Sequence, residues 1–178
     1  MTRDRFTLLG VVAALIVLAA DQASKFWVLH ILHLPEVGEI RLLPVLAFTM
    51  VWNRGITFGL LNGLGPWSSV ILAAFALVVV VALGLWLRRA ESRITAIALG
   101  AIAGGAVGNV IDRLRYGAVV DFIRAHIGNW SWYVFNIADA AIVCGVVALV
   151  FASQMSRGTG MDGSGTLDKR SPHDASAR

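Results

Sequence analysis

Trp67-Ser-Ser-Val-Ile-Leu-Ala-Ala-Phe-Ala-Leu-Val-Val-Val-Val-Ala-Leu-Gly-Leu-Trp-Leu87 is the stretch that decides the fold. Apart from its two serines it is apolar throughout, and it has the length of about 20 residues that a helix needs to cross the hydrocarbon core of a bilayer. Arg88 and Arg89 follow at once. The stretch therefore predicts a transmembrane helix.

The composition agrees with a membrane protein. Of the 178 residues, 57% are hydrophobic and only 15% are charged, whereas soluble domains carry about 25% charged residues. This excludes a water-soluble enzyme. The net charge of +4 comes without a long basic run, so the basic residues are expected to set topology, and no nucleic-acid partner is expected. A single cysteine excludes a disulfide framework, and the four scattered histidines give no zinc pattern.

Three further segments have transmembrane character. The first is Phe6–Ala20, which a more polar helical stretch extends to about Leu32. It could instead be a cleavable signal peptide, but no small-x-small site precedes a soluble domain. The predicted helices are therefore about 6–32, 67–87, 94–113 and 134–152. Residues 153–178 are rich in Gly, Ser and Asp without periodicity, which predicts a disordered cytoplasmic tail.

The basic residues favour an orientation with both termini in the cytoplasm, because the inner segments then hold more Lys and Arg than the outer ones. Most tryptophans fall at the predicted outer ends, where their rings anchor in the headgroup layer. Two outer stretches, Val45–Trp52 and Tyr116–Phe122, are β-like. We expect a small sheet on the outer membrane face, with a β-rich segment at about residues 35–60.

Polar residues at membrane depth are costly, so they are candidates for function. Asp21 and Lys25 are four residues apart and can pair on one helix face, either as a structural salt bridge or as part of a site. Gly100, Gly104 and Gly108 form a stripe suited to close helix packing. That packing places Asn109, Asp112 and Arg113 together at the outer end of the third helix.

Asp121 and Asp139 form the most suggestive pair, since both are flanked by apolar residues and both are predicted near the outer interface. Two close carboxylates in a poorly hydrated site cannot both ionise comfortably, so one keeps its proton. Such a pair can act as acid and base in peptide hydrolysis. The residues alone leave a proton or cation relay as the alternative. Motifs for a zinc protease or a serine hydrolase are absent from the sequence.

Five motifs in order carry a resemblance to a known family. They are Asp21-Gln-Ala-Ser-Lys25, Asn53-Arg-Gly-Ile-Thr-Phe-Gly59, Gly104-Gly-Ala-Val-Gly-Asn-Val-Ile-Asp-Arg113, Val119-Val-Asp-Phe122 and Phe135-Asn-Ile-Ala-Asp139. Together they resemble the lipoprotein signal peptidases (signal peptidase II, aspartyl peptidase family A8), which are bacterial membrane proteases. The resemblance runs from Asp21 to about Val150 and leaves the tail outside it.

The resemblance implies an all-α membrane protein with four transmembrane helices, a small extracytoplasmic β-cradle and a short outer helix. It implies cleavage of diacylglyceryl-modified prolipoproteins before the lipidated cysteine, without metal or organic cofactor. Asp121 and Asp139 match the catalytic pair, and Asp21 and Lys25 match a structural pair. Other positions match residues that bind substrate or support the site: Asn53, Gly55, Gly108, Asn109, Asp112, Arg113, Asn136 and Ala138.

The expected setting is the bacterial cytoplasmic (inner) membrane, with the active site at the outer face. The expected partners are prolipoprotein substrates and membrane lipids, and the chain is expected to be a monomer. Arg54 or Arg113 could meet polar lipid or backbone groups. A small ion or proton translocator is the alternative from another class, but it should arrange acids along the membrane depth. Here the acids cluster at one outer level, and a purely structural subunit would leave them unexplained.

Overall fold

The computed structural model describes residues 3–55, 67–127, 130–131 and 133–158. Its long helices are α1 (Arg3–Phe26), α3 (Trp67–Leu87), α4 (Arg93–Tyr116) and α5 (Ile137–Gly158). A π-helical segment, Trp27–Ile31, continues α1. Four helices of the described chain are long and apolar enough to cross a membrane, so the chain is a multi-pass membrane protein. The predicted set of spans is confirmed.

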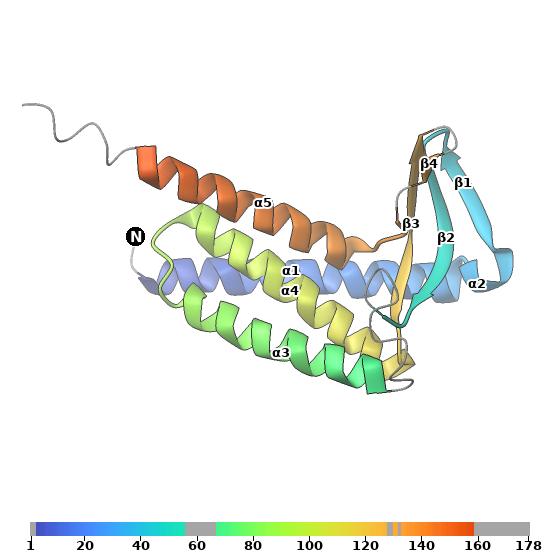
Figure 1. Ribbon diagram of the computed structural model, residues 1–178, viewed down its shortest axis with the longest axis horizontal. Helices are drawn as coiled ribbons and strands as arrows, with labels where there is room; N and C mark the ends of the chain where they lie inside the picture. Colours follow the sequence, from blue (N-terminus) through green and yellow to red (C-terminus); the bar gives the residue numbers. More distant parts are fainter. Residues whose placement is uncertain (1–2, 56–66, 128–129, 132, 159–178) are drawn as a thin grey trace, which may run out of the picture.

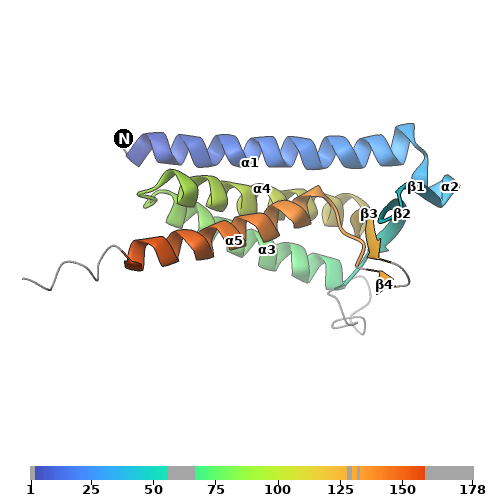
Figure 2. The same cartoon turned by 90° about the horizontal axis from the view of Figure 1, so that it is seen from above.

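α4 is the central helix, and α1, α3 and α5 all pack against it (Figure 2). The glycine stripe of α4 explains why α1 packs so closely against α4. A Cβ on Gly100 would meet the backbone of Gly10, and a Cβ on Gly104 would meet the backbone of Ala14. The two backbones therefore touch where only glycine leaves room, as predicted for this spacing.

The helix ends differ from the sequence prediction most clearly in α4 and α5. α4 continues past residue 113 to Tyr116, where Gly117 adopts a left-handed conformation (φ 68°) and its N–H caps the helix. α5 begins at Ile137 rather than at residue 134, because the backbone of Phe135 pairs with Ile123 instead. At its other end α5 continues through residue 153 to Gly158. The rest of the predicted tail, 159–178, lies outside the described residues.

A short helix, α2 (Leu34–Val37), leads into an antiparallel sheet at one end of the bundle (Figure 1). Its strands follow the order β1 (Glu39–Leu43), β2 (Leu46–Asn53), β3 (Val119–Ile127) and β4 (Trp130–Ser131). The predicted stretch 45–52 thus becomes β2. The predicted stretch 116–122 is displaced to β3, because the first of its residues still belongs to α4. The start of α1 and the end of α5 both lie at the opposite end of the bundle (Figure 1).

Alternation along β3 gives the two sides of the sheet different tasks. Val120 and Phe122 are buried in an apolar cluster with Val28 and Leu34, from the end of the first helix and from α2. Since successive side chains of a strand point to opposite faces, Asp121 between them turns the other way, toward the helices. The apolar cluster thereby fixes the direction of that carboxylate.

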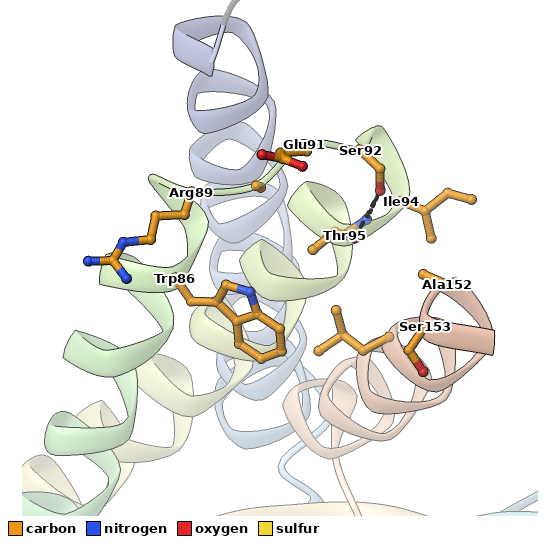
Figure 3. Close-up of a pocket in the computed structure, with 10 residues that line it drawn as sticks. Trp86, Arg89, Glu91, Ser92, Ile94, Thr95, Ala152 and Ser153 are labelled. Atoms are coloured by element: carbon orange, nitrogen blue, oxygen red, sulfur yellow. Dashed lines mark hydrogen bonds between the residues drawn. The ribbon is translucent and has the colours of Figure 1, made fainter. Parts of the chain in front are cut away.

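The end of the bundle remote from the sheet contains a cavity of about 730 Å³ (Figure 3). Trp86 and Leu149 supply apolar wall, and Ser92 caps the start of α4 by accepting a hydrogen bond from the N–H of Thr95 at 3.1 Å. The one acid in its lining, Glu91, is exposed and forms an ion pair with Arg3. This cavity therefore offers no pair of carboxylates for acid–base chemistry.

Candidate active site

Asp121 is a buried carboxylate on β3 that accepts hydrogen bonds from two amides. Asn53, the last residue of β2, donates to Oδ2 at 3.0 Å, and Asn136 donates to Oδ1 at 2.7 Å. Burial raises the pKa of Asp121 from 3.8 to about 6, and the negative charge of Asp139 adds to that rise. The two amides and Lys25 act in the opposite direction. Asp121 can therefore hold a proton near neutral pH.

Asp139 lies in the first turn of α5 and forms a reciprocal cap with Asn136. The N–H of Asp139 donates to Asn136 Oδ1 at 2.9 Å, and the N–H of Asn136 donates to Asp139 Oδ2 at 3.3 Å. This is the capping-box arrangement, which satisfies N–H groups that a helix start leaves free. The positive end of the helix dipole also favours a negative charge here.

Two asparagines join the carboxylates into one unit. The side-chain amide of Asn136, which holds Asp121, also donates to Asn109 Oδ1 at 3.2 Å. Asn109 in turn donates to Asp139 Oδ1 at 2.8 Å. Because a single amide orientation satisfies each of these contacts, Asp121 and Asp139 are held from separate segments around a shared pair of amides.

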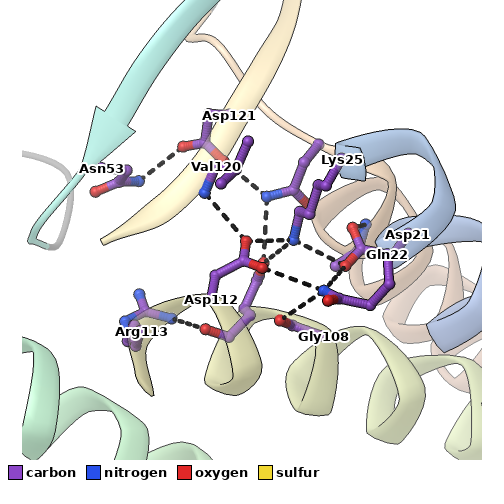
Figure 4. A network of polar contacts seen from close by, with 12 residues as sticks. Asp21, Gln22, Lys25, Asn53, Gly108, Asp112, Arg113, Val120 and Asp121 are labelled. Atoms are coloured by element: carbon purple, nitrogen blue, oxygen red, sulfur yellow. Dashed lines mark hydrogen bonds and ion pairs between the residues drawn. The ribbon is translucent and has the colours of Figure 1, made fainter. Parts of the chain in front are cut away.

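A second polar cluster lies directly beside them (Figure 4). Lys25 Nζ forms ion pairs with Asp21 at 2.8 Å and with Asp112 at 2.7 Å, and all three side chains are buried. Lys25 also donates to Asn109 Oδ1 at 3.2 Å. The predicted pair of Asp21 and Lys25 is present, and Asp112 completes it as a third member.

Both acids of this Lys25 cluster also hold backbone next to the candidate carboxylates. Asp21 Oδ1 accepts from the N–H of Ala138 at 3.0 Å, and Asp112 Oδ2 accepts from the N–H of Val120 at 3.1 Å. Ala138 precedes Asp139 and Val120 precedes Asp121. The Lys25 cluster thereby anchors both chain segments that carry the pair.

The chain was compared with known proteins. A family profile described as "Signal peptidase (SPase) II" matches residues 13–155. The chain belongs to the signal peptidase II family. It is 52% identical over 147 residues to the lipoprotein signal peptidase of Methylorubrum extorquens (strain PA1), which covers 81% of this chain and 84% of the relative. It is 46% identical over 149 residues to that of Rhodopseudomonas palustris (strain ATCC BAA-98 / CGA009), with 82% and 91% covered.

Solved structures show the same architecture. The chain resembles a bacterial membrane enzyme determined by the in meso method at 1.9 Å resolution, with a TM-score of 0.69, 26% identity, and 80% of this chain and 90% of that chain covered. A second bacterial membrane enzyme, determined at 2.3 Å resolution, gives a TM-score of 0.72 at 24% identity over 89% and 94% of the two chains. As a signal peptidase II, the chain is an aspartic-type endopeptidase.

The remaining predicted site residues of this signal peptidase II surround the same cluster. A Cβ on Gly108 would meet the carboxylate of Asp21, so glycine is needed there. The N–H of Gly55 donates to Asn53 Oδ1 at 3.2 Å, which fixes the amide that faces Asp121. Arg113 donates to the carbonyl of Asn109 at 3.3 Å, and its buried Nε has no hydrogen-bond partner among the described residues.

One member of the network was not predicted as a site residue. The amide of Gln22 donates to Asp21 Oδ2 at 3.2 Å, to Asp112 Oδ1 at 3.1 Å and to the carbonyl of Gly108 at 3.3 Å. It thereby ties α1 to α4 beside the ion pairs. A polar amide within a transmembrane helix was the signal that could have indicated it. Within the described ranges no group of His, Cys, Asp and Glu side chains is arranged to hold a metal ion.

Proposed function

We propose that Asp121 and Asp139 are the catalytic pair with which this signal peptidase II removes the signal peptide of diacylglyceryl-modified prolipoproteins, before the lipidated cysteine. The observation that carries the proposal is the shared pair of amides, Asn109 and Asn136, which holds the two carboxylates together from separate segments. The raised pKa of Asp121, about 6, favours a proton on this member of the pair.

In the proposed chemistry, Asp121 carries the proton and Asp139 is ionised. Ionised Asp139 takes a proton from a water molecule, which attacks the carbonyl carbon of the scissile bond. Neutral Asp121 donates a hydrogen bond to the carbonyl oxygen and stabilises the charge that develops there. The proton held by Asp139 then passes to the leaving nitrogen as the carbon–nitrogen bond breaks. Each step uses only water and the two side chains.

The setting proposed for this reaction is the outer face of the bacterial inner membrane, with both termini in the cytoplasm. Two observations support it. The sheet lies at one end of the bundle, and the start of α1 and the end of α5 lie at the other (Figure 1). The segments assigned to the inner side hold more basic residues than the outer ones. A lipid anchor on the substrate fixes the scissile bond near the headgroups, which is the level of Asp121 and Asp139. We further propose that the enzyme acts as a monomer in contact with membrane lipids.

The proposal is tested with purified wild type, Asp121→Asn and Asp139→Asn in detergent. Each protein is given a diacylglyceryl-modified prolipoprotein and its unmodified precursor, and cleavage is followed on a gel. Wild type is expected to cleave only the lipidated form, and both variants should fold yet leave it intact. Undiminished cleavage by either folded variant would exclude the proposed pair, and equal cleavage of the unmodified precursor would exclude recognition of the lipid.

A further inference from the structure

A second, smaller cavity lies on the other side of β2 from Asn53. Its volume is about 200 Å³, and it is lined by Trp52, Arg54, Tyr116 and Ala118. The rings of Trp52 and Tyr116 meet edge to face with centroids 5.6 Å apart, and Ala118 is buried. The cavity therefore has an aromatic wall, a small apolar floor and a guanidinium group at its rim.

Both edges of this aromatic cavity are fastened to the same helix. Ser68 in the first turn of α3 donates to the carbonyl of Arg54 at 3.2 Å. Its neighbour Ser69 donates to the carbonyl of Gly117, in the turn between Tyr116 and Ala118. Both serines are buried. Because separate chain segments are tied to one helix start, the relative position of the cavity walls is built into the fold.

The charge at the rim is unusual for this end of the molecule. Arg41 and Arg124 on the sheet both form ion pairs with Glu39. Within the described part of the chain, by contrast, no carboxylate lies within ion-pair distance of Arg54 or Arg115. The guanidinium carbon of Arg115 lies 5.3 Å from the centre of the Tyr116 ring. Arg54 lines the cavity and Arg115 lies against the ring of Tyr116, which lines it too, so two guanidinium groups without carboxylate partners are available to attract an anion.

The level of the cavity along the bundle indicates which kind of anion it binds. It lies where α3 begins and α4 ends, at the level where helices leave the hydrocarbon core. Near these helix ends, Val70 in α3 and Leu114 in α4 are 52% and 69% exposed, so both helices present aliphatic side chains to the bilayer close to the level of the cavity. Arginine and aromatic side chains above exposed aliphatic side chains match a phospholipid, with its phosphate in the headgroup layer and its acyl chain below.

We propose that this aromatic cavity binds the phosphate group of an anionic phospholipid from the leaflet that faces the active site. Arg54 and Arg115 bind the phosphate oxygens, Trp52 and Tyr116 pack against the glycerol, and an acyl chain lies along Val70 and Leu114. The site is separate from the peptidase chemistry, although Arg54 directly follows Asn53. A bound phospholipid thus holds the chain segment that positions the amide facing Asp121.

The experiment measures lipid binding directly and needs no turnover. Purified protein in detergent is titrated with phosphatidylglycerol, with diacylglycerol and with inorganic phosphate, and bound lipid is counted by native mass spectrometry. The variants are Arg54→Gln, Arg115→Gln and, as a matched control, Arg41→Gln on the outer sheet. Phosphatidylglycerol should bind wild type and the control equally. Each of the other variants should bind about tenfold more weakly, since each loses a charge-assisted contact to phosphate.

Three results would overturn the proposal. Equal binding by Arg54→Gln, Arg115→Gln and Arg41→Gln would mean that general surface charge attracts the lipid. If diacylglycerol bound as tightly as phosphatidylglycerol, the phosphate would not be recognised. If inorganic phosphate competed as strongly as phosphatidylglycerol, the lipid part would not be recognised. A substrate carboxylate is the rival occupant. If Arg54→Gln changed the preference for acidic over amide residues after the substrate cysteine, with lipid binding intact, the cavity would serve the peptide. Because binding is counted without cleavage, its failure is independent of the proposed catalytic pair.

Discussion

Two groups of carboxylates lie side by side at the sheet end of the bundle, and their surroundings differ. Asp21 and Asp112 share the ammonium group of Lys25, at 2.8 and 2.7 Å, and all three side chains are buried. Asp121 and Asp139 have amides around them and no cation in direct contact among the described residues. The comparison shows how one protein uses the same side chain for two tasks. The carboxylates paired with a lysine anchor backbone, and the carboxylates held by amides are the pair that we propose to be catalytic.

The largest effect is expected from removing either carboxylate of the proposed catalytic pair. Asp121→Asn or Asp139→Asn should lower kcat by at least about 10³-fold, and the double variant should be little worse, because residues that act as a unit are not additive. The thermal unfolding temperature in detergent should stay close to that of wild type, since asparagine keeps the shape and the buried charge is gone. Additive losses in single and double variants would show that the acids act independently.

Removing the shared cation should instead destabilise the protein. Lys25→Met leaves the buried carboxylates of Asp21 and Asp112 without a cation, which typically costs about 3–5 kcal/mol of folding free energy. Thermal unfolding in detergent should show a clear loss, with activity falling because Val120 and Ala138 lose their anchors. Arg41→Met is the control, since that ion pair is exposed and worth about 0–1 kcal/mol. An unfolding temperature that Lys25→Met leaves unchanged would contradict the anchoring role.

Separating α1 from α4 should weaken the anchor without touching any charge. Gly104→Ala places a methyl group against the backbone of Ala14, so the helices must move apart. Overpacking of this kind costs about 1–3 kcal/mol, measurable as a lower unfolding temperature. Gly84→Ala in α3 is the matched control, because nothing lies within 4 Å of its added Cβ. Equal unfolding temperatures for the two variants would mean that the glycine stripe is not a close contact.

The smallest effect concerns the pH dependence of kcat/KM, which should reflect the proposed catalytic pair Asp121 and Asp139. The pKa of Asp121 is about 6, so kcat/KM should fall as pH rises through 6 and the neutral acid is lost. Asn53→Ala removes a hydrogen bond that favours the charged form, which should move this fall to higher pH by up to about one unit. Thr49→Ala on the same strand should leave the profile unchanged. A shift to lower pH would contradict the assigned direction.

The free energy of unfolding should also depend on pH through the titration of Asp121. Because the pKa of Asp121 is raised in the folded state, its contribution to stability is complete below about pH 4 and is lost as pH rises through about 6. The difference in unfolding temperature between wild type and Asp121→Asn should therefore change over that interval.

The sequence predicted the anchor less completely than the membrane spans. Apolar length is a local property, so the four spans could be read directly from it, and the i, i+4 spacing predicted the contact of Asp21 with Lys25. The contact of Lys25 with Asp112 joins residues far apart in the chain, and no local pattern contains it. The same holds for the contacts that Gln22 makes with Gly108 and Asp112 on another helix. That the segment before Asn136 is extended rather than helical also depends on a distant partner, Ile123 in β3.

The capping box at the start of α5 has a consequence for how this site can vary. Asn136 and Asp139 hold one another's backbone, so the position of the Asp139 carboxylate depends on the number of residues between it and the start of the helix. One inserted or deleted residue between them would rotate Asp139 about the helix axis by about 100°, a displacement that no side-chain substitution could repair. The α5 start should therefore tolerate exchanges at Ile137 far better than any change in length.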